Sequence, residues 1–199
     1  MTRIYFVRHA EPEHSWEDDR TRPLTEAGKK DSKIVLDFLK DKKIDMFYCS
    51  PYKRSVDTIL ESASYFEKEI ITDERLRERE KGPDGNTHGM FEKRWFDYNF
   101  HEDGGESISM VQKRNIEVLN MILENSKDTN IVIGTHGTSL SAIINYFDSE
   151  FGCKDFLRII DWMPYIIELD FEEKELVAKK DQCYIEKEFK GKARADKNK

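Results

Sequence analysis

The chain begins with MTRIYFVRHA, residues 1–10, in which an apolar run is followed directly by an arginine and a histidine. The run Ile4–Val7 predicts a strand that is buried on both faces, as in the interior of a parallel sheet. Such sheets bind ligands beyond the carboxyl ends of their strands, which is where Arg8 and His9 come. An arginine suits a phosphate, and a neutral imidazole can act as a base, a ligand or a nucleophile. Alone, the pair is more often an incidental surface feature, so its meaning depends on how the other strands end.

A second strand is expected at residues 44–49. Ser50 after it is a typical N-cap and Pro51 suits the first position of a helix, which predicts a helix from here to about residue 65. Arg54 falls in the first turn of that helix, where a cation is disfavoured unless an anion is bound. The alternative is an arginine that extends into solvent, and this segment alone does not decide between the two.

The third apolar run, at residues 130–134, is followed by Thr135-His136-Gly137 and then by a helical pattern from residue 140. Thr138 or Ser139 is expected to cap this helix, whose N–H groups then face the same edge of the sheet. The carboxyl ends of parallel strands lie on one edge, so the arginines and histidines that follow the three runs are expected to converge there.

The remaining pattern predicts an α/β protein of three layers, with a mostly parallel central sheet and helices on both faces. A helix is expected to begin near Thr25 and another after Ser107. The runs at residues 162–171 and 175–184 predict an antiparallel hairpin at the edge of the sheet.

Composition limits the class of protein. The 199 residues, 38% of them hydrophobic, suffice for one domain, which we place at residues 1–189 ahead of a polar, disordered tail at 190–199. A net charge of −7 argues against nucleic-acid binding, which needs a basic face. The chain shows neither an apolar run as long as a membrane span nor a secretory signal. Its three widely spaced cysteines form no disulfide framework, so we expect a cytoplasmic protein without a membrane partner. The oligomeric state is not indicated.

Convergent arginines and histidines, without a Gly-rich lysine loop or a carboxylate cage for Mg²⁺, indicate phosphoryl transfer carried by histidine itself. The imidazole would attack phosphorus while the arginines neutralise the equatorial oxygens, so we expect no metal and no cofactor. The reaction also needs an acid for the leaving oxygen. The candidate stretch is Asp73–Gly82, which by composition is also a solvated charge run. Its spacing leaves Glu74, Glu78 and Glu80 open as the acid.

These motifs, in their order along the chain, resemble the histidine phosphatase superfamily, which has the phosphoglycerate mutase-like fold. The resemblance covers roughly residues 3–171. It is carried by Arg8-His9-Ala10, Pro23-Leu24-Thr25 with Gly28, Ser50-Pro51 with Arg54 and Thr58, Leu76-Arg77-Glu78 with Gly82, Gly104-Gly105-Glu106-Ser107, and Thr135-His136-Gly137.

The resemblance implies a metal-independent phosphomonoester hydrolase that acts on a small-molecule phosphomonoester or a phosphoprotein. His9 is implied as the phosphorylated nucleophile and Glu78 as the general acid and base. The phosphate pocket is implied to consist of Arg8, Arg54 and His136. Further substrate contacts are expected from Ser15 and Gly137.

Two departures from the family pattern bear on the activity. Many members have Gly where Ala10 stands, and a hydroxyl residue and Asn where this chain has Pro12 and Ser15. Pro12 lacks a hydroxyl and a backbone donor that could touch the phosphoryl group, which weakens the case for a phosphoglycerate mutase more than that for a hydrolase. A second alternative is a non-catalytic phosphoprotein-binding module, against which the retained histidines and Glu78 argue, because binding alone needs no acid.

Residues 79–106 resemble an insertion over the active site, helical around residues 92–98. Its aromatic residues, within 82–101, are expected either to form a wall for the substrate or to pack the insertion onto the sheet. The insertion lacks the pair of adjacent arginines that we would expect for binding the carboxylate of a phosphoglycerate.

Overall fold

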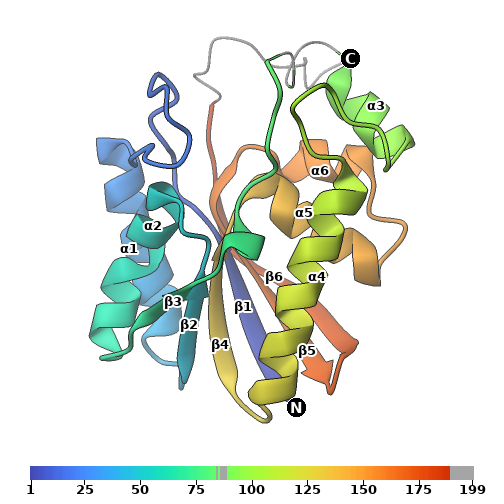
Figure 1. Cartoon of the computed structure of the whole chain (residues 1–199). Coiled ribbons are helices and arrows are strands. Elements are labelled where there is room, and N and C mark those ends of the chain that lie inside the picture. Colours follow the sequence, from blue (N-terminus) through green and yellow to red (C-terminus); the bar gives the residue numbers. More distant parts are fainter. Residues whose placement is uncertain (84, 86–88, 189–199) are drawn as a thin grey trace.

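A computed structural model describes residues 1–83, 85 and 89–188 and contains a six-stranded mixed sheet between two layers of helices (Figure 1). The strands, in the order β3-β2-β4-β1-β5-β6 across the sheet, are β1 (Thr2–Arg8), β2 (Met46–Cys49), β3 (Ile70–Thr72), β4 (Asn130–Thr135), β5 (Trp162–Glu172) and β6 (Glu175–Glu186). β1 to β4 are parallel, whereas β5 and β6 form an antiparallel hairpin next to β1. The predicted fold class is confirmed, and the predicted tail lies outside the described residues.

Helices cover both faces of the sheet. One face carries α1 (Glu26–Leu39) and α2 (Lys53–Tyr65); the other carries α4 (Ile108–Asn125), α5 (Gly137–Phe147) and α6 (Cys153–Ile159) (Figure 1). A 3₁₀ turn, η1 (Glu74–Leu76), and a short helix, α3 (Met90–Phe96), precede α4. None of the helices in the described ranges has the length and apolar character needed to cross a membrane.

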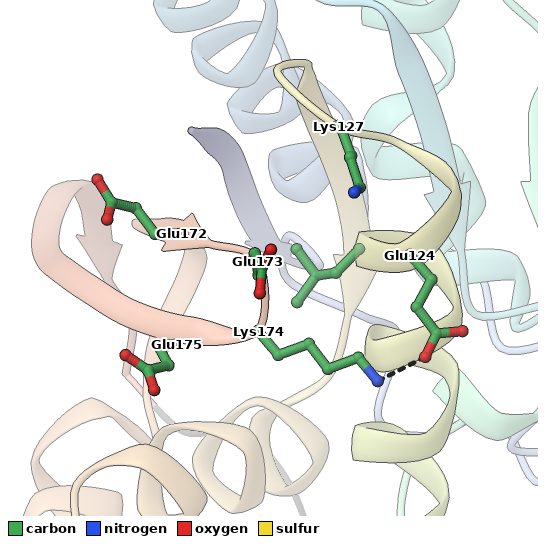
Figure 2. Close-up of a pocket in the computed structure, with 7 residues that line it drawn as sticks. Glu124, Lys127, Glu172, Glu173, Lys174 and Glu175 are labelled. Carbon is green, nitrogen blue, oxygen red and sulfur yellow. Dashed lines mark hydrogen bonds and ion pairs between the residues drawn. The ribbon is translucent and has the colours of Figure 1, made fainter.

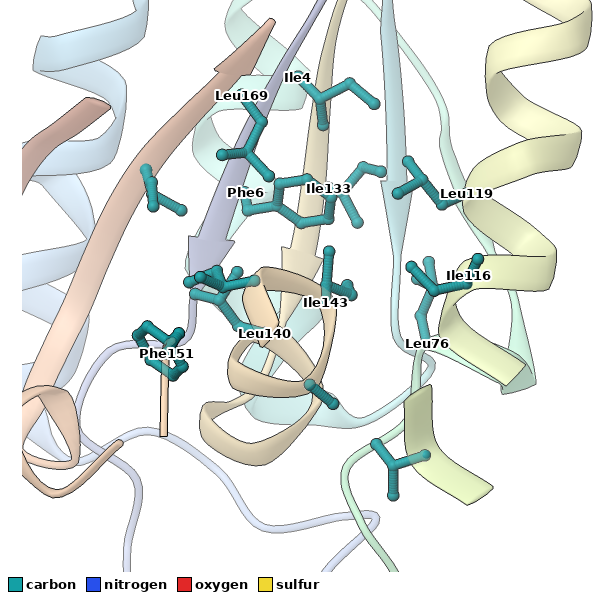
Figure 3. Packing of buried hydrophobic residues seen from close by; sticks show 14 of the residues in the cluster. Ile4, Phe6, Leu76, Ile116, Leu119, Ile133, Leu140, Ile143, Phe151 and Leu169 are labelled. Carbon is teal, nitrogen blue, oxygen red and sulfur yellow. The ribbon is translucent and has the colours of Figure 1, made fainter. Parts of the chain in front are cut away.

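The side chains of β1 alternate between two apolar clusters, which explains why every residue of the run is apolar. Ile4 and Phe6 pack with residues of α4 and α5 (Figure 3), whereas Tyr5 and Val7 pack with residues of α1 and α2. All four side chains are almost completely buried. β1 therefore lies in the middle of the molecule, and the residues after it are held by a rigid strand.

The helix starts follow the sequence predictions in two cases and differ in two. α1 begins next to Thr25 and α4 next to Ser107, as predicted, and both residues act as caps, with their hydroxyls accepting from the amides of Gly28 and Met110. The prediction of Ser50 as the cap of α2 is wrong, because α2 begins at Lys53 after the N-cap Tyr52.

The expected cap of α5 is also wrong. The helix begins earlier, at Gly137, with His136 as its N-cap residue and no capping hydrogen bond from its side chain. The amides of Thr138 and Ser139 instead donate to a carboxylate from another segment, that of Glu78. An external anion thus replaces the local cap.

The insertion is attached to the domain by aromatic packing, and a buried ionic cluster within it links its own segments. Phe91 and Trp95 of α3 lie against Phe156 of α6, with ring centroids 5.3 and 5.6 Å apart. The carboxylate of Glu102 contacts the guanidinium groups of Arg79 and Arg94 at 2.8 and 3.1 Å. Phe91 and Trp95 therefore serve as core rather than as an open wall, whereas Phe96 is 93% exposed.

Candidate active site

The strand register brings the candidate residues together at the carboxyl edge of the sheet. Arg8 pairs with Thr135 across β1 and β4, and Cys49 pairs with Gly134 across β2 and β4. Two hydrogen bonds extend this register past the strand ends, from the His9 amide to the Thr135 carbonyl and from the Ser50 amide to the Gly134 carbonyl. His9, Ser50 and His136 are therefore neighbours at one level above three adjacent strands.

His9 is held as a neutral imidazole with one nitrogen directed by the backbone. Nδ1 lies 2.8 Å from the carbonyl oxygen of Ala10. Since a carbonyl only accepts, Nδ1 carries the proton, which leaves the lone pair on Nε2. Burial lowers the pKa of His9 well below its usual 6.5, and the charges of Arg54 and Arg8 lower it further. The imidazole is thus unprotonated at neutral pH, as a nucleophile must be.

The loop position of His9 is itself fixed by α2. The amide of Ala10 donates to the Thr58 hydroxyl at 2.9 Å, and that hydroxyl donates to the carbonyl of Arg54 at 2.7 Å. This chain of two hydrogen bonds links the residue after the histidine to the helix that carries the second arginine. Thr58, which the resemblance includes without a role, therefore has a positioning role.

His136 lies beside His9 and is completely buried. The two ring centroids are 5.3 Å apart, and Nε2 of His136 lies 2.7 Å from the Ser50 hydroxyl. Burial, followed by the charge of Arg54, lowers the pKa of His136 well below 6.5. Among the described residues, Nδ1 of His136 has no hydrogen-bond partner. Such an unsatisfied buried atom is costly, and a ligand oxygen could satisfy it if its proton is placed there.

Arg8 is buried between α5 and α6. Its Nη1 donates to the carbonyl of Ile159, the last residue of α6, at 2.7 Å. Gly137 makes room for it, because a Cβ there would lie 3.2 Å from Cζ and Nη2 of Arg8. The glycine that the resemblance assigned to substrate binding thus shapes the place of an arginine.

Arg54 lies in the first turn of α2 and is only 3% exposed. It contacts Asp19 of the long loop after β1, with Nη1 donating to the main-chain oxygen at 2.5 Å and Nη2 lying 3.4 Å from Oδ2. Burial lowers its pKa, which the charges of Asp19 and Glu78 oppose. Of the two alternatives that this segment left open, the structure therefore shows a buried arginine rather than one that extends into solvent.

Tyr52 lies against both Arg54 and His136. Its ring centroid lies 5.2 Å from that of His136 and 5.0 Å from Cζ of Arg54. The sequence analysis did not identify this residue. An aromatic residue two positions before a buried arginine was its only signal.

Of the three glutamates left open as the acid, Glu78 is the one that contacts the start of α5. Its Oε2 accepts from the amide of Thr138 at 3.1 Å, and Oε1 accepts from that of Ser139 at 3.3 Å. Both helix residues come directly after His136 and Gly137, so the carboxylate lies at the pocket. Glu74 and Glu80 have exposed side chains that pair with Arg20 and Arg77.

Ser15 lies on the exposed loop between β1 and α1. Its hydroxyl donates to Oε1 of Glu13 at 2.8 Å. Its predicted substrate contact stays a prediction, as do the catalytic roles of the pocket residues.

The opposite edge of the sheet has a different character. A hollow there is lined by Leu123, Glu124, Lys127 and the turn at residues 172–175 (Figure 2). It lies at the β5–β6 turn, where Phe171 pairs with Thr2 at the start of β1, far along the strand from Arg8. Within residues 1–83, 85 and 89–188, no group of three or more His, Cys, Asp or Glu side chains is arranged to hold a metal ion.

Comparison with known proteins shows the family. The model of the histidine phosphatase superfamily (branch 1) matches residues 4–180. The chain belongs to this superfamily. The chain is 27% identical over 164 residues to phosphoserine phosphatase 1 of Hydrogenobacter thermophilus, an alignment that covers 72% of this chain and 74% of that protein. The predicted family and the class of phosphatase are confirmed.

Two further relatives widen the comparison. The 2,3-bisphosphoglycerate-dependent phosphoglycerate mutase of Thermoplasma acidophilum is 31% identical over 137 residues, which is 62% of each chain. The structure of a mycobacterial glucosyl-3-phosphoglycerate phosphatase complexed with VO3 superposes with a TM-score of 0.76 at 15% identity, covering 93% of this chain and 99% of that one. This second likeness supports the fold.

Proposed function

We propose that this histidine phosphatase hydrolyses phosphomonoesters through a phosphohistidine at His9. The observation that carries the proposal is the neutral imidazole, whose Nδ1 is bound to the Ala10 carbonyl while its Nε2 keeps a lone pair close to Arg8 and Arg54. A carboxylate that could serve as the acid, that of Glu78, lies at the start of α5, next to His136 in the chain.

In the first step, Nε2 of His9 attacks phosphorus as the bond to the ester oxygen breaks, and Arg8 and Arg54 balance the charge on the equatorial oxygens. His136, also neutral, donates a hydrogen bond to one of those oxygens. Glu78 gives its proton to the leaving oxygen, which departs as an alcohol.

In the second step, water replaces the alcohol. The carboxylate of Glu78 takes a proton from the water as its oxygen attacks phosphorus and the bond to Nε2 breaks. Inorganic phosphate leaves, and both His9 and Glu78 return to their starting forms. The cycle uses only groups that lie at the carboxyl edge of the sheet.

We propose small phosphorylated metabolites, rather than nucleic acid or membrane components, as substrates, with phosphoproteins a further class. The printed names of relatives support this choice, since they include a phosphoserine phosphatase and a phosphoglycerate mutase. A cytoplasmic location is part of the proposal and is supported by three cysteines that are all free.

The mutase relative makes phosphoglycerate mutase the second candidate. Against it, the arginines of the insertion, Arg79 and Arg94, are buried and share the carboxylate of Glu102, so neither is open to a substrate. Incubation with 3-phosphoglycerate and 2,3-bisphosphoglycerate separates the two activities. Conversion to 2-phosphoglycerate faster than phosphate release would favour the mutase.

The proposal is tested by measuring phosphate release from a panel of phosphomonoesters, followed by rapid acid and alkaline quenching with a ³²P-labelled substrate that is turned over. A phosphohistidine is labile in acid and stable in alkali, so label should remain on the protein only under alkaline conditions. An acid-stable phosphoenzyme would point to serine or aspartate as the carrier. Lack of turnover with every ester would favour the binding module.

A further inference from the structure

A third arginine, Arg20 in the loop after β1, lies close to the candidate site, against the ring of Tyr52. Its backbone is held at both polar groups, with the amide donating to Oδ1 of Asp18 at 3.0 Å and the carbonyl accepting from the amide of Lys53 at 2.9 Å. The latter bond ties the loop to the first residue of α2. The backbone of Arg20 is therefore held in place, although its side chain is 51% exposed.

Arg20 and the buried Arg54 share one aromatic ring. Cζ of Arg20 lies 5.1 Å from the centroid of Tyr52, and Cζ of Arg54 lies 5.0 Å from it. The two guanidinium groups are thus separated by no more than twice that span. Their exposure differs, because Arg54 is only 3% exposed whereas the side chain of Arg20 is 51% exposed.

The guanidinium of Arg20 already holds a carboxylate in the two-pronged geometry that suits this pair. Nη1 donates to Oε2 of Glu74 at 3.2 Å, and Nη2 donates to Oε1. The pKa of Glu74 is lowered by its hydrogen bond and charge interaction with Arg20 and, to a smaller degree, by Arg77. Both partners are more than half exposed, so the pair contributes little to stability and a competing carboxylate can replace Glu74.

We infer that Arg20 is a specificity residue that binds the carboxylate of a phosphomonoester whose phosphoryl group lies on Arg54. The inference rests on the function proposed above and deepens it, since it selects esters that carry a carboxylate a few bonds from the phosphate. Glu74 stands in for that carboxylate when no substrate is bound. Each arginine reaches its anion through hydrogen bonds of about 2.8 Å, so a short substrate spans the distance between them.

The test uses two substrates that differ in the carboxylate alone: O-phosphoserine and O-phosphoethanolamine. For the wild-type enzyme and for Arg20→Ala, kcat/KM is measured on both, and the ratio for phosphoserine over phosphoethanolamine is compared. We expect Arg20→Ala to reduce this ratio about tenfold, the effect of about 1.4 kcal/mol, mostly through a higher KM for phosphoserine.

Lys53→Ala is the matched control. Lys53 has the same charge, the same 51% side-chain exposure and a backbone bond to Arg20, but its side chain pairs with Asp57 on α2. Its removal should leave the ratio as in the wild-type enzyme. An equal fall for Lys53→Ala would mean that general positive charge, rather than Arg20, attracts the substrate, and the inference would be wrong.

Two further variants keep the test decisive if Arg20→Ala is poorly folded. Arg20→Lys retains the charge and loses the fork, so the ratio should lie between those of the wild type and the alanine variant. Glu74→Gln removes the competing carboxylate, so the ratio should rise severalfold. An unchanged ratio in Arg20→Lys and Glu74→Gln overturns the role of Arg20, whereas the absence of any turnover by the wild-type enzyme on the whole ester panel overturns the proposed function instead.

Discussion

The phosphate pocket and the carboxylate of Glu78 lie next to each other but are held in different ways. His9 and His136 come directly after β1 and β4, and backbone hydrogen bonds continue the strand register up to His9. Glu78 comes from an irregular segment between η1 and the insertion, and its carboxylate is held by three amides, including that of Arg79 at 2.7 Å.

The difference separates the two chemical tasks. In the proposed mechanism His9 attacks phosphorus along one line, so a rigid strand end is a suitable support for it. In the proposed mechanism Glu78 exchanges a proton, and the amides at the start of α5 position its carboxylate for that exchange.

The largest effect is expected for His9→Ala. The covalent step then lacks its nucleophile, and His136 cannot replace it because its Nε2 is bound to Ser50. Turnover of every ester, including p-nitrophenyl phosphate, should fall below detection, while circular dichroism shows a folded protein. Residual activity within tenfold of the wild type would contradict the assignment of His9, because the pocket at the strand ends would then not contain the nucleophile.

A smaller and substrate-dependent effect is expected for Glu78→Gln. On an alkyl phosphate, whose leaving oxygen needs a proton, kcat should fall about 10²–10⁴-fold, the usual range for general acid catalysis. On p-nitrophenyl phosphate, whose leaving group needs little protonation, the first step should suffer much less. Burst kinetics on both substrates measure the first step separately from hydrolysis of the phosphoenzyme.

Glu80→Gln is the control for that variant. Glu80 belongs to the same charged run, but its side chain is 64% exposed and lies 3.7 Å from Arg77 rather than at α5. Its removal should leave both substrates near wild-type rates. Equal small effects of both variants on the alkyl phosphate would mean that the acid lies elsewhere, for instance at His101 of the insertion.

The same contrast explains how much the sequence could predict. Apolar runs that end in Arg8-His9 and Thr135-His136 predict two strands of one sheet. Because these strands are parallel neighbours, their register places the two histidines side by side. Glu78 has no such signal, because charge runs lack the periodicity that reports a buried face. It was selected by family resemblance, and only the contacts with α5 distinguish it from Glu74 and Glu80.

Other features depend on contacts that no local pattern reports. β3 has three residues, too few to show an alternating pattern. Arg8 donates to the carbonyl of Ile159, which is the last residue of a seven-residue helix and lies more than 150 positions from Arg8 in the sequence. The helix caps of α2 and α5 were placed wrongly for a related reason: Ser50 contacts His136, and Glu78 takes the amides that a local cap would have used.

The pocket histidines also predict a pH dependence of stability. Both imidazoles have a folded-state pKa well below about 6.5, the unfolded value, so the unfolded chain binds protons that the folded chain does not. The free energy of unfolding should therefore be largest above pH 6.5. It should decrease as the pH falls below 6.5, by up to about 1.4 kcal/mol per pH unit for each histidine. Urea unfolding at pH 7, 6 and 5 measures the slope.

His136→Asn tests this origin of the slope, since it removes one of the two imidazoles that take up a proton on unfolding. The variant should be less stable at pH 7 because the Ser50 contact is altered, but its stability should fall less steeply with acid. A slope as steep as that of the wild type would show that the pH dependence arises outside the pocket, for instance at His14, whose pKa is also lowered by burial.

The smallest expected effect is that of a chelator. In the proposed mechanism Arg8 and Arg54 supply the positive charge that metal ions supply in many phosphatases, and the part of the chain that the structure describes offers no cluster of metal-binding side chains. EDTA at millimolar concentration should leave kcat/KM unchanged, while vanadate, which the pocket should hold in place of a phosphoryl group, should inhibit competitively. A zinc-dependent alkaline phosphatase assayed in the same buffer confirms that chelation is effective. Loss of activity that Mg²⁺ or Zn²⁺ restores would show that the arginines are insufficient. The residues at the strand ends would then not form the complete pocket.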